Sequence, residues 1–202
     1  GVLLQHPVKS ALSGASLTRA PRPGQAALLV LNAVQPVGVS TLVMDRYGLA
    51  PALGSVAAVK PLAAVEALDA GSFTNLATVV APVGGDARPG DVIMGVNVTY
   101  DDGSELDVEV SYGDIEVLPL PLGHEAILEL RPTKGFDVGL GKPGKGGKRR
   151  VSGGLAGLIV DARGRPLPAP ADDETHTSAC RSGSIRLGAR ALRVKAYSML
   201  MF

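Results

Sequence analysis

The stretch from Gly139 to Arg150, "GLGKPGKGGKRR", has residue types and a spacing that could bind a phosphate. It begins Gly-x-x-x-x-Gly-Lys, the spacing of a P-loop, but Gly146 stands where a P-loop has Ser or Thr. A working P-loop also joins a strand to a helix, whose N-terminal amides hold the phosphates. Here "GKRRVSGGLAGLIV" follows, which predicts a β-like apolar run and no helix. We therefore expect no nucleotide site in this stretch.

The same stretch is strongly cationic. Its five basic residues are Lys142, Lys145, Lys148, Arg149 and Arg150. We interpret it as a long hairpin-like loop with a cationic tip, between "FDVGL" and "LAGLIVDA". Two roles stay open. The five side chains bind an anion, a nucleic acid or an acidic protein surface, or the loop keeps a sheet edge soluble.

The remaining reactive side chains predict neither a catalytic residue nor a metal site. His6, His124 and His176 lie far apart, no Gly-x-Ser-x-Gly nucleophile motif is present, and His124 is expected in a turn. The acidic residues between 101 and 116 alternate along predicted strands, which is typical of a solvated sheet face. The single cysteine, Cys180, excludes an internal disulfide, and no Cys/His cluster has zinc-ligand spacing.

A net charge of +1 conceals a strong segregation along the chain. Residues 86–137 carry 12 acidic against 3 basic side chains, whereas residues 138–202 carry 4 acidic against 12 basic ones. This asymmetry indicates either separate surfaces for separate partners or strands whose opposite charges face one another.

Residues 1–70 have the pattern of an α/β layer. A helix is expected over "QAALLVLNAV" after Pro23, and its apolarity on nearly every face predicts that neighbours enclose it. "VSTLVMD" predicts a buried strand ending at Asp45, and two short helices are expected over "RYGLAPALGSVAAV" and "PLAAVEALD". Gln, Asn, Pro and Gly interrupt the uncharged residues 23–44, so we expect no membrane span.

Residues 71–170 have the pattern of an all-β sandwich or barrel domain. "DVIMGVNVTY" and "ELDVEVSY" alternate with period two around a hairpin turn at Asp101–Ser104, and further strands are expected over "IEVLPL", "EAILEL", "FDVGL" and "LAGLIVDA". Residues 171–202 fit neither pattern, and we expect an atypical, disordered tail. The alternative for this tail is a basic amphipathic helix.

Three segments together resemble a known family: "TRAPRPGQAALLVLNAVQPVGVSTLVMDRYGLAPALG", "GFDVGLGKPGKGG" and "GGLAGLIVDARGRPLP". The chain from Gly1 to about Pro168 resembles the C-terminal part of the glutamate-mutase-associated MutL family, which is unrelated to the mismatch-repair protein. Family members look like ATPases of the actin/Hsp70/sugar-kinase superfamily that assist a cobalamin-dependent mutase. The resemblance implies that residues 1–70 are a helix–strand–helix remnant of the ATPase core and that residues 71–170 are a β appendage.

The resemblance also implies that most of the nucleotide machinery is missing from this chain. Gly1 matches the end of the family's glycine-rich adenosine motif, and the phosphate-binding hairpins are expected further upstream. Full-length members are implied to use ATP and magnesium, whereas this chain is expected to bind no cofactor and to have no activity alone. The tail after Pro168 departs from the family pattern, as a shifted reading frame would.

Two functions of different classes follow from these observations. The first is a fragment of an ATPase-like accessory or reactivating chaperone for a cobalamin-dependent, glutamate-type mutase. The mutase subunits are then the partners, the compartment is the cytoplasm, and the β domain is the docking module. The second is a β domain that binds nucleic acid or another anion through the basic glycine-rich stretch.

Overall fold

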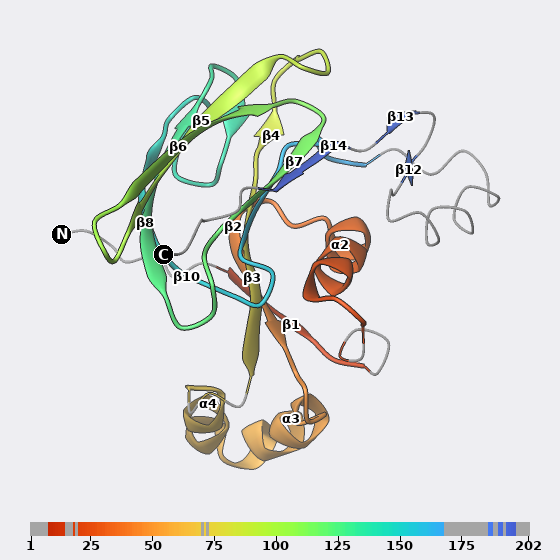
Figure 1. Ribbon diagram of the computed structural model, residues 1–202. Helices are drawn as coiled ribbons and strands as arrows, with labels where there is room; N and C mark the ends of the chain where they lie inside the picture. The colour runs from red at the N-terminus through yellow and green to blue at the C-terminus, as the bar shows by residue number, and fades with distance from the viewer. Residues whose placement is uncertain are drawn as a thin grey trace.

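The computed structural model describes residues 8–14, 18, 20–69, 71 and 73–167, together with the backbones of strands 186–187, 190–191 and 193–196. The fold is mixed α/β, with more strand than helix (Figure 1). The helices are α2 (Pro23–Val34), α3 (Ala50–Val59) and α4 (Pro61–Asp69). The central sheet has six strands in the order β1 (Val8–Leu12), β2 (Gly38–Met44), β3 (Thr74–Ala81), β11 (Leu158–Asp161), β7 (Asp114–Leu118) and β14 (Arg193–Ala196).

A second sheet has four antiparallel strands, in the order β10 (Gly147–Ser152), β8 (Glu125–Pro132), β5 (Val92–Tyr100) and β6 (Glu105–Ser111). Two short pairs complete the described strands, β4 (Val83–Gly84) with β9 (Phe136–Asp137) and β12 (Arg186–Leu187) with β13 (Arg190–Ala191). The hairpin predicted at residues 101–104 joins β5 to β6, which confirms that part of the sequence analysis.

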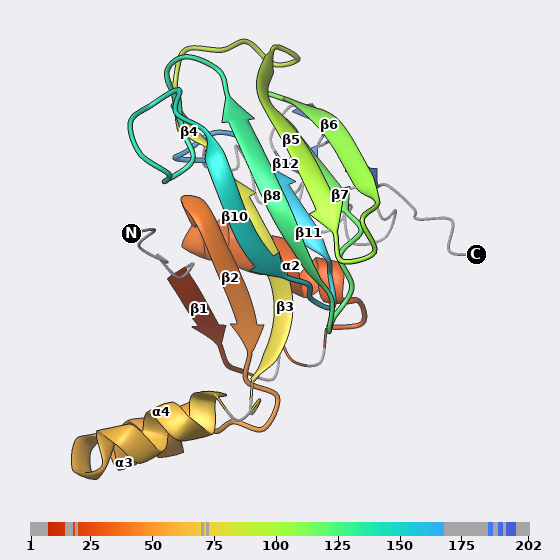
Figure 2. The ribbon, with the colours of Figure 1, turned by 90° about the vertical axis from the view of Figure 1, so that its left-hand side faces the viewer.

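The two large sheets and α2 form three layers, with one hydrophobic core on each face of the six-stranded sheet (Figure 2). Along β11, Leu158 and Val160 point into the core shared with the four-stranded sheet, whereas Ile159 points into the core covered by α2. A strand buried on both faces has a continuous apolar sequence, and the first three residues of β11, "LIV", have this property.

Helix α2 buries one face, which corrects the prediction that its neighbours enclose it. Ala26, Ala27 and Leu31 lie in the core, but Leu29 and Val34 on the opposite side are exposed. Pro23 starts the helix, and Gln35 ends it in the left-handed conformation with φ of 47°.

The domain boundary expected at residues 70 and 71 falls in the connection between α4 and β3. One sheet nevertheless contains strands from both sides of this boundary, because β2 pairs with β3 and β3 pairs in parallel with β11. Of the expected tail, β14 pairs in parallel with β7. Apart from β12, β13 and β14, residues 171–202 lie outside the described residues.

Candidate docking surfaces and end pocket

The basic stretch contains a strand, which corrects its interpretation as one long loop. Residues 138–146 form the turns, and Lys148, Arg149 and Arg150 lie on β10, the edge strand beside β8. No helix follows the P-loop-like spacing, because the chain enters β10 directly. The geometry that would hold a phosphate at a helix N-terminus is therefore not formed at this stretch.

Two of the five basic side chains are paired with acidic neighbours. Lys148 Nζ lies 3.1 Å from a carboxylate oxygen of Glu129, and Arg150 Nη1 lies 3.5 Å from one of Glu125, both on β8. These are the cross-strand charge pairs that the segregated charge allowed. Arg149 lies on the opposite face of β10, half-buried.

Lys142 and Lys145 remain as the cations of the turn. Both are exposed, and the Lys145 N–H donates to the carbonyl of Lys142 at 2.9 Å. Neither forms an ion pair with another described residue. Two exposed lysines give a much weaker electrostatic site than the five cations of the sequence suggested. Gly1, the remnant of the adenosine motif in the resemblance, lies outside the described residues.

The helical pair α3–α4, which we call the apolar hairpin, has exposed large hydrophobic side chains at Val56, Val59, Leu62, Val65 and Leu68. No residue of α3 is buried, and Val59 and Leu62 are 79% and 70% exposed. The two helices pack mainly on each other and protrude from the ends of β2 and β3 (Figure 1, Figure 2). A helix that is apolar all round normally lies inside a protein or an interface. The sequence predicted both helices but not their exposure.

Asp45 fixes the start of the apolar hairpin. Its side chain is almost fully buried after β2, and its carboxylate accepts the N–H groups of Ala50 at 2.8 Å and Leu49 at 2.9 Å. The hydrogen bond from Ala50 is the main cause that lowers the pKa of Asp45 below its usual value. A carboxylate at this position satisfies free amides at the helix start and favours the positive end of the helix dipole. The hairpin is therefore held at its base although its surface is exposed.

A pocket of about 940 Å³, which we call the end pocket, opens at one end of the sandwich. Its lining comes from the β5–β6 turn, the loop between β7 and β8, and the loop between β10 and β11. The apolar walls include Val117, Leu118, Leu120, Leu122 and Leu155. The polar lining is Tyr100, Asp101, Asp102, His124 and Glu125. His124, which the sequence placed in a turn without a role, lies on this lining.

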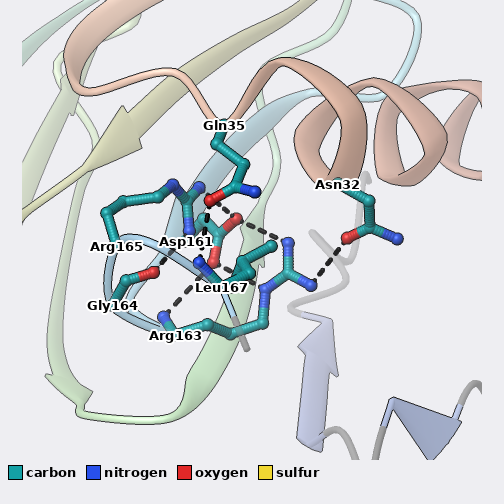
Figure 3. A network of polar contacts seen from close by, with 7 residues as sticks. All are labelled: Asn32, Gln35, Asp161, Arg163, Gly164, Arg165 and Leu167. Carbon is teal, nitrogen blue, oxygen red and sulfur yellow. Dashed lines mark hydrogen bonds and ion pairs between the residues drawn. The ribbon is translucent and has the colours of Figure 1, made fainter. Parts of the chain in front are cut away.

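A buried charge cluster ties the segment after β11 to the end of α2 (Figure 3). The carboxylate of Asp161 accepts hydrogen bonds from Nε and Nη2 of Arg163, at 2.8 and 2.7 Å, and from Nη2 of Arg165, at 2.7 Å. All three side chains are at most 7% exposed. Arg163 Nη1 also donates to Asn32 Oδ1 on α2, at 2.8 Å. The cluster thus connects the central sheet to the helix layer.

The electrostatics of this cluster favour the charged carboxylate. Burial alone raises the pKa of Asp161, but the hydrogen bonds and charges of Arg163 and Arg165 together outweigh it and lower the pKa below its usual value. At the same place, the backbone N–H of Leu167 donates to the side-chain oxygen of Gln35 at 2.8 Å. Since these contacts join the buried charged side chains to one another and to the helix layer, we assign the cluster a structural role.

No three His, Cys, Asp or Glu side chains within the described part of the chain are arranged to hold a metal ion. Among the described residues, no helix is long and apolar enough to cross a membrane. The chain matches no protein-family model, and no curated protein and no solved structure matches it significantly.

Proposed function

We propose that this chain is a docking component of a larger protein assembly and that the apolar hairpin is its main contact with the partner. The exposure of Val59 and Leu62 on a hairpin fixed by Asp45 is the observation that carries this proposal. An exposed apolar patch of contiguous side chains marks an interaction surface in most soluble proteins. Burial of such side chains in a partner would supply the apolar environment that α3 lacks.

The resemblance suggests the partner. In this proposal the chain is part of an ATPase-like accessory or reactivating chaperone, and it binds the subunits of a cobalamin-dependent, glutamate-type mutase. The β domain was the docking module expected from the sequence, and the proposal extends that module to the hairpin rooted in the same sheet. ATP and magnesium belong to full-length family members, so the chain alone is proposed to bind neither.

The proposal is tested by calorimetric titration of the full chain with a purified cobalamin-dependent glutamate mutase. The variant Val59→Glu/Leu62→Glu places two charges on the hairpin at exposed positions, where we expect folding to be unaffected, and circular dichroism of the variant checks this. We expect it to bind at least about tenfold more weakly than the wild type, as for central interface residues. The variant Lys142→Glu/Lys145→Glu reverses two exposed charges outside the hairpin and serves as the matched control.

Two results contradict the proposal. If the double glutamate variant and the lysine control bind the mutase as tightly as the wild type, the hairpin is not the docking surface. If the chain alone binds ATP tightly in a magnesium-dependent manner, the nucleotide machinery is present after all, and the interpretation as a docking fragment fails.

A further inference from the structure

The end pocket has the size and lining of a small-molecule site. Its volume of about 940 Å³ lies within the range of roughly 300–1,000 Å³ that such sites occupy. Leucine, valine and proline side chains form most of the apolar wall. The polar lining residues lie near one another, since Asp101 accepts a hydrogen bond from Glu125 and Asp102 interacts electrostatically with Tyr100 and His124. This combination, an apolar wall with a small polar cluster, fixes the orientation of a ligand as well as holding it.

The polar side of the pocket is negatively charged. Asp101 uses one oxygen to accept the N–H of Glu125 at 2.9 Å, and Asp102 accepts the N–H and hydroxyl of Ser104 at 2.9 and 2.6 Å. Both aspartates receive these hydrogen bonds from neutral donors and not from cations. The hydrogen bonds from Ser104 lower the pKa of Asp102 and keep it ionised.

Cations near the pocket balance this charge incompletely. Glu125 lies 3.5 Å from Arg150, but neither Asp101 nor Asp102 forms an ion pair with another described residue. His124 also lines the pocket, and its electrostatic interaction with Asp102 contributes to the lowered pKa of that aspartate. A concave site with one sign of charge concentrates ligands of the opposite sign.

Tyr100 gives a second, independent indication of a ligand. It lines the pocket, and its hydroxyl is buried with no hydrogen-bond partner within the described residues. Burial and the charge of Asp102 raise the pKa of Tyr100, so the hydroxyl stays protonated and can donate a hydrogen bond. A buried polar group without a partner is costly, and a bound acceptor would remove that cost.

We propose that the end pocket binds a small amphipathic organic cation. Its apolar body lies against the walls formed by Leu120, Leu122 and Leu155, and its cationic head lies beside Asp101 and Asp102. An oxygen acceptor on the ligand would receive the Tyr100 hydroxyl hydrogen bond. The site lies on the sandwich and does not depend on the docking role of the apolar hairpin.

The test compares three ligands with the same apolar chain, decylammonium, decanoate and decanol. The two ions are titrated into the full chain below their micelle concentrations, and decanol is titrated below its solubility limit. Decylammonium is expected to bind at least about tenfold more tightly than decanoate, because the charge at the pocket favours a cation. The variant Asp101→Asn/Asp102→Asn should lose this preference and keep its affinity for decanol. Asp107→Asn, on the exposed face of β6, serves as the control and should keep the preference.

Amide chemical-shift mapping locates the bound ligand without any substitution. Shifts over residues 100–102, 117–125 and 154–157 are expected, and tyrosine fluorescence gives a second signal because the chain has no tryptophan. Shifts confined to the apolar hairpin would overturn the proposal, since they would place the amphiphile on α3–α4. Equal affinity for decylammonium and decanoate would overturn it as well.

Discussion

Replacement of Asp161 by asparagine removes the carboxylate that lies between two buried guanidinium groups. Arg163 and Arg165 are 7% and 6% exposed, and Asp161 is the acidic side chain that pairs with both in the described structure. Asparagine keeps the size of the side chain and can accept one hydrogen bond, but it leaves two buried positive charges uncompensated. The variant therefore tests charge compensation and not packing.

The expected loss is large because breaking a buried ion pair from one side typically costs about 3–5 kcal/mol. For a protein of this size, each kcal/mol lowers the melting temperature by roughly 2–4 °C, so we expect a decrease of the order of 10 °C. Urea unfolding followed by circular dichroism measures the free energy of unfolding. An m-value equal to that of the wild type would show that the variant exposes the same surface on unfolding.

Asp107→Asn is the matched control. It removes the carboxylate from the Asp107–Arg131 pair, which has a short contact of 2.7 Å but side chains that are more than half exposed. Exposed pairs contribute little to stability, so this variant should unfold close to the wild type. If Asp161→Asn and Asp107→Asn lower the free energy of unfolding by the same amount, burial does not determine how much the Asp161 cluster contributes to stability. That result would refute our reasoning.

Three further predictions concern the pH dependence, the backbone packing and the basic turn. Since the folded pKa of Asp161 lies below its usual value of 3.8, its contribution to the free energy of unfolding is complete above that pH and is lost as the pH falls through the folded pKa. The free energy of unfolding should therefore fall less steeply with acid for Asp161→Asn than for the wild type. The same pH dependence in both proteins would contradict this prediction. Gly154→Ala should lower the free energy of unfolding by roughly 1–3 kcal/mol, because the added Cβ would lie 2.7 Å from the Leu76 carbonyl. Gly24→Ala, with open space around it, should change this free energy by about 1 kcal/mol or less. Thermal unfolding compares the two variants, and an unchanged stability of Gly154→Ala would show that the loop moves freely. DNA and RNA binding through the basic stretch should be undetectable at about 50 mM salt, or should have a salt slope no steeper than about −2. Of the five cations of this stretch, Lys142 and Lys145 are the exposed ones that form no ion pair with another described residue. A slope near −5 would restore the anion-binding hypothesis for all five cations.

The sequence predicted the elements with strong local patterns. Met94, Val96 and Val98 alternate toward the core as the period of two indicated, and Val92 departs from this face because the register shifts beside it. The helix after Pro23 and the strand ending before Asp45 were also confirmed. Each of these signals lies within about ten residues of sequence, the range over which periodicity and turn chemistry act.

The sequence did not predict the features that depend on distant partners. "GKRRVS" has a single large apolar residue, Val151, so its strand is stabilised by pairing with β8 and by charge pairs that no local pattern shows. The parallel pairing of residues 78–80 with 158–160 likewise has no local signal. The Asp161 cluster was predictable in part, since "DARGR" places both arginines two and four residues after the aspartate.

The properties of the candidate surfaces likewise depend on contacts between residues that are distant in sequence. The charges of the basic stretch are visible in the sequence, but the pairing of Lys148 with Glu129 and of Arg150 with Glu125 requires the fold. The sequence predicted α3 and α4 as short helices and made no prediction about their burial, which depends on what the rest of the fold covers. Because the apolar residues of α3 are exposed in the structure, the apolar hairpin is the strongest candidate for a docking surface.

Hydrogen–deuterium exchange of the full chain, with and without a purified cobalamin-dependent glutamate mutase, tests the docking claim most directly. We predict that amides within residues 50–69 of the apolar hairpin exchange more slowly in the complex, because partner contacts suppress local opening of α3 and α4. Unchanged exchange across the hairpin, together with slower exchange on β10 or around the end pocket, would contradict the account.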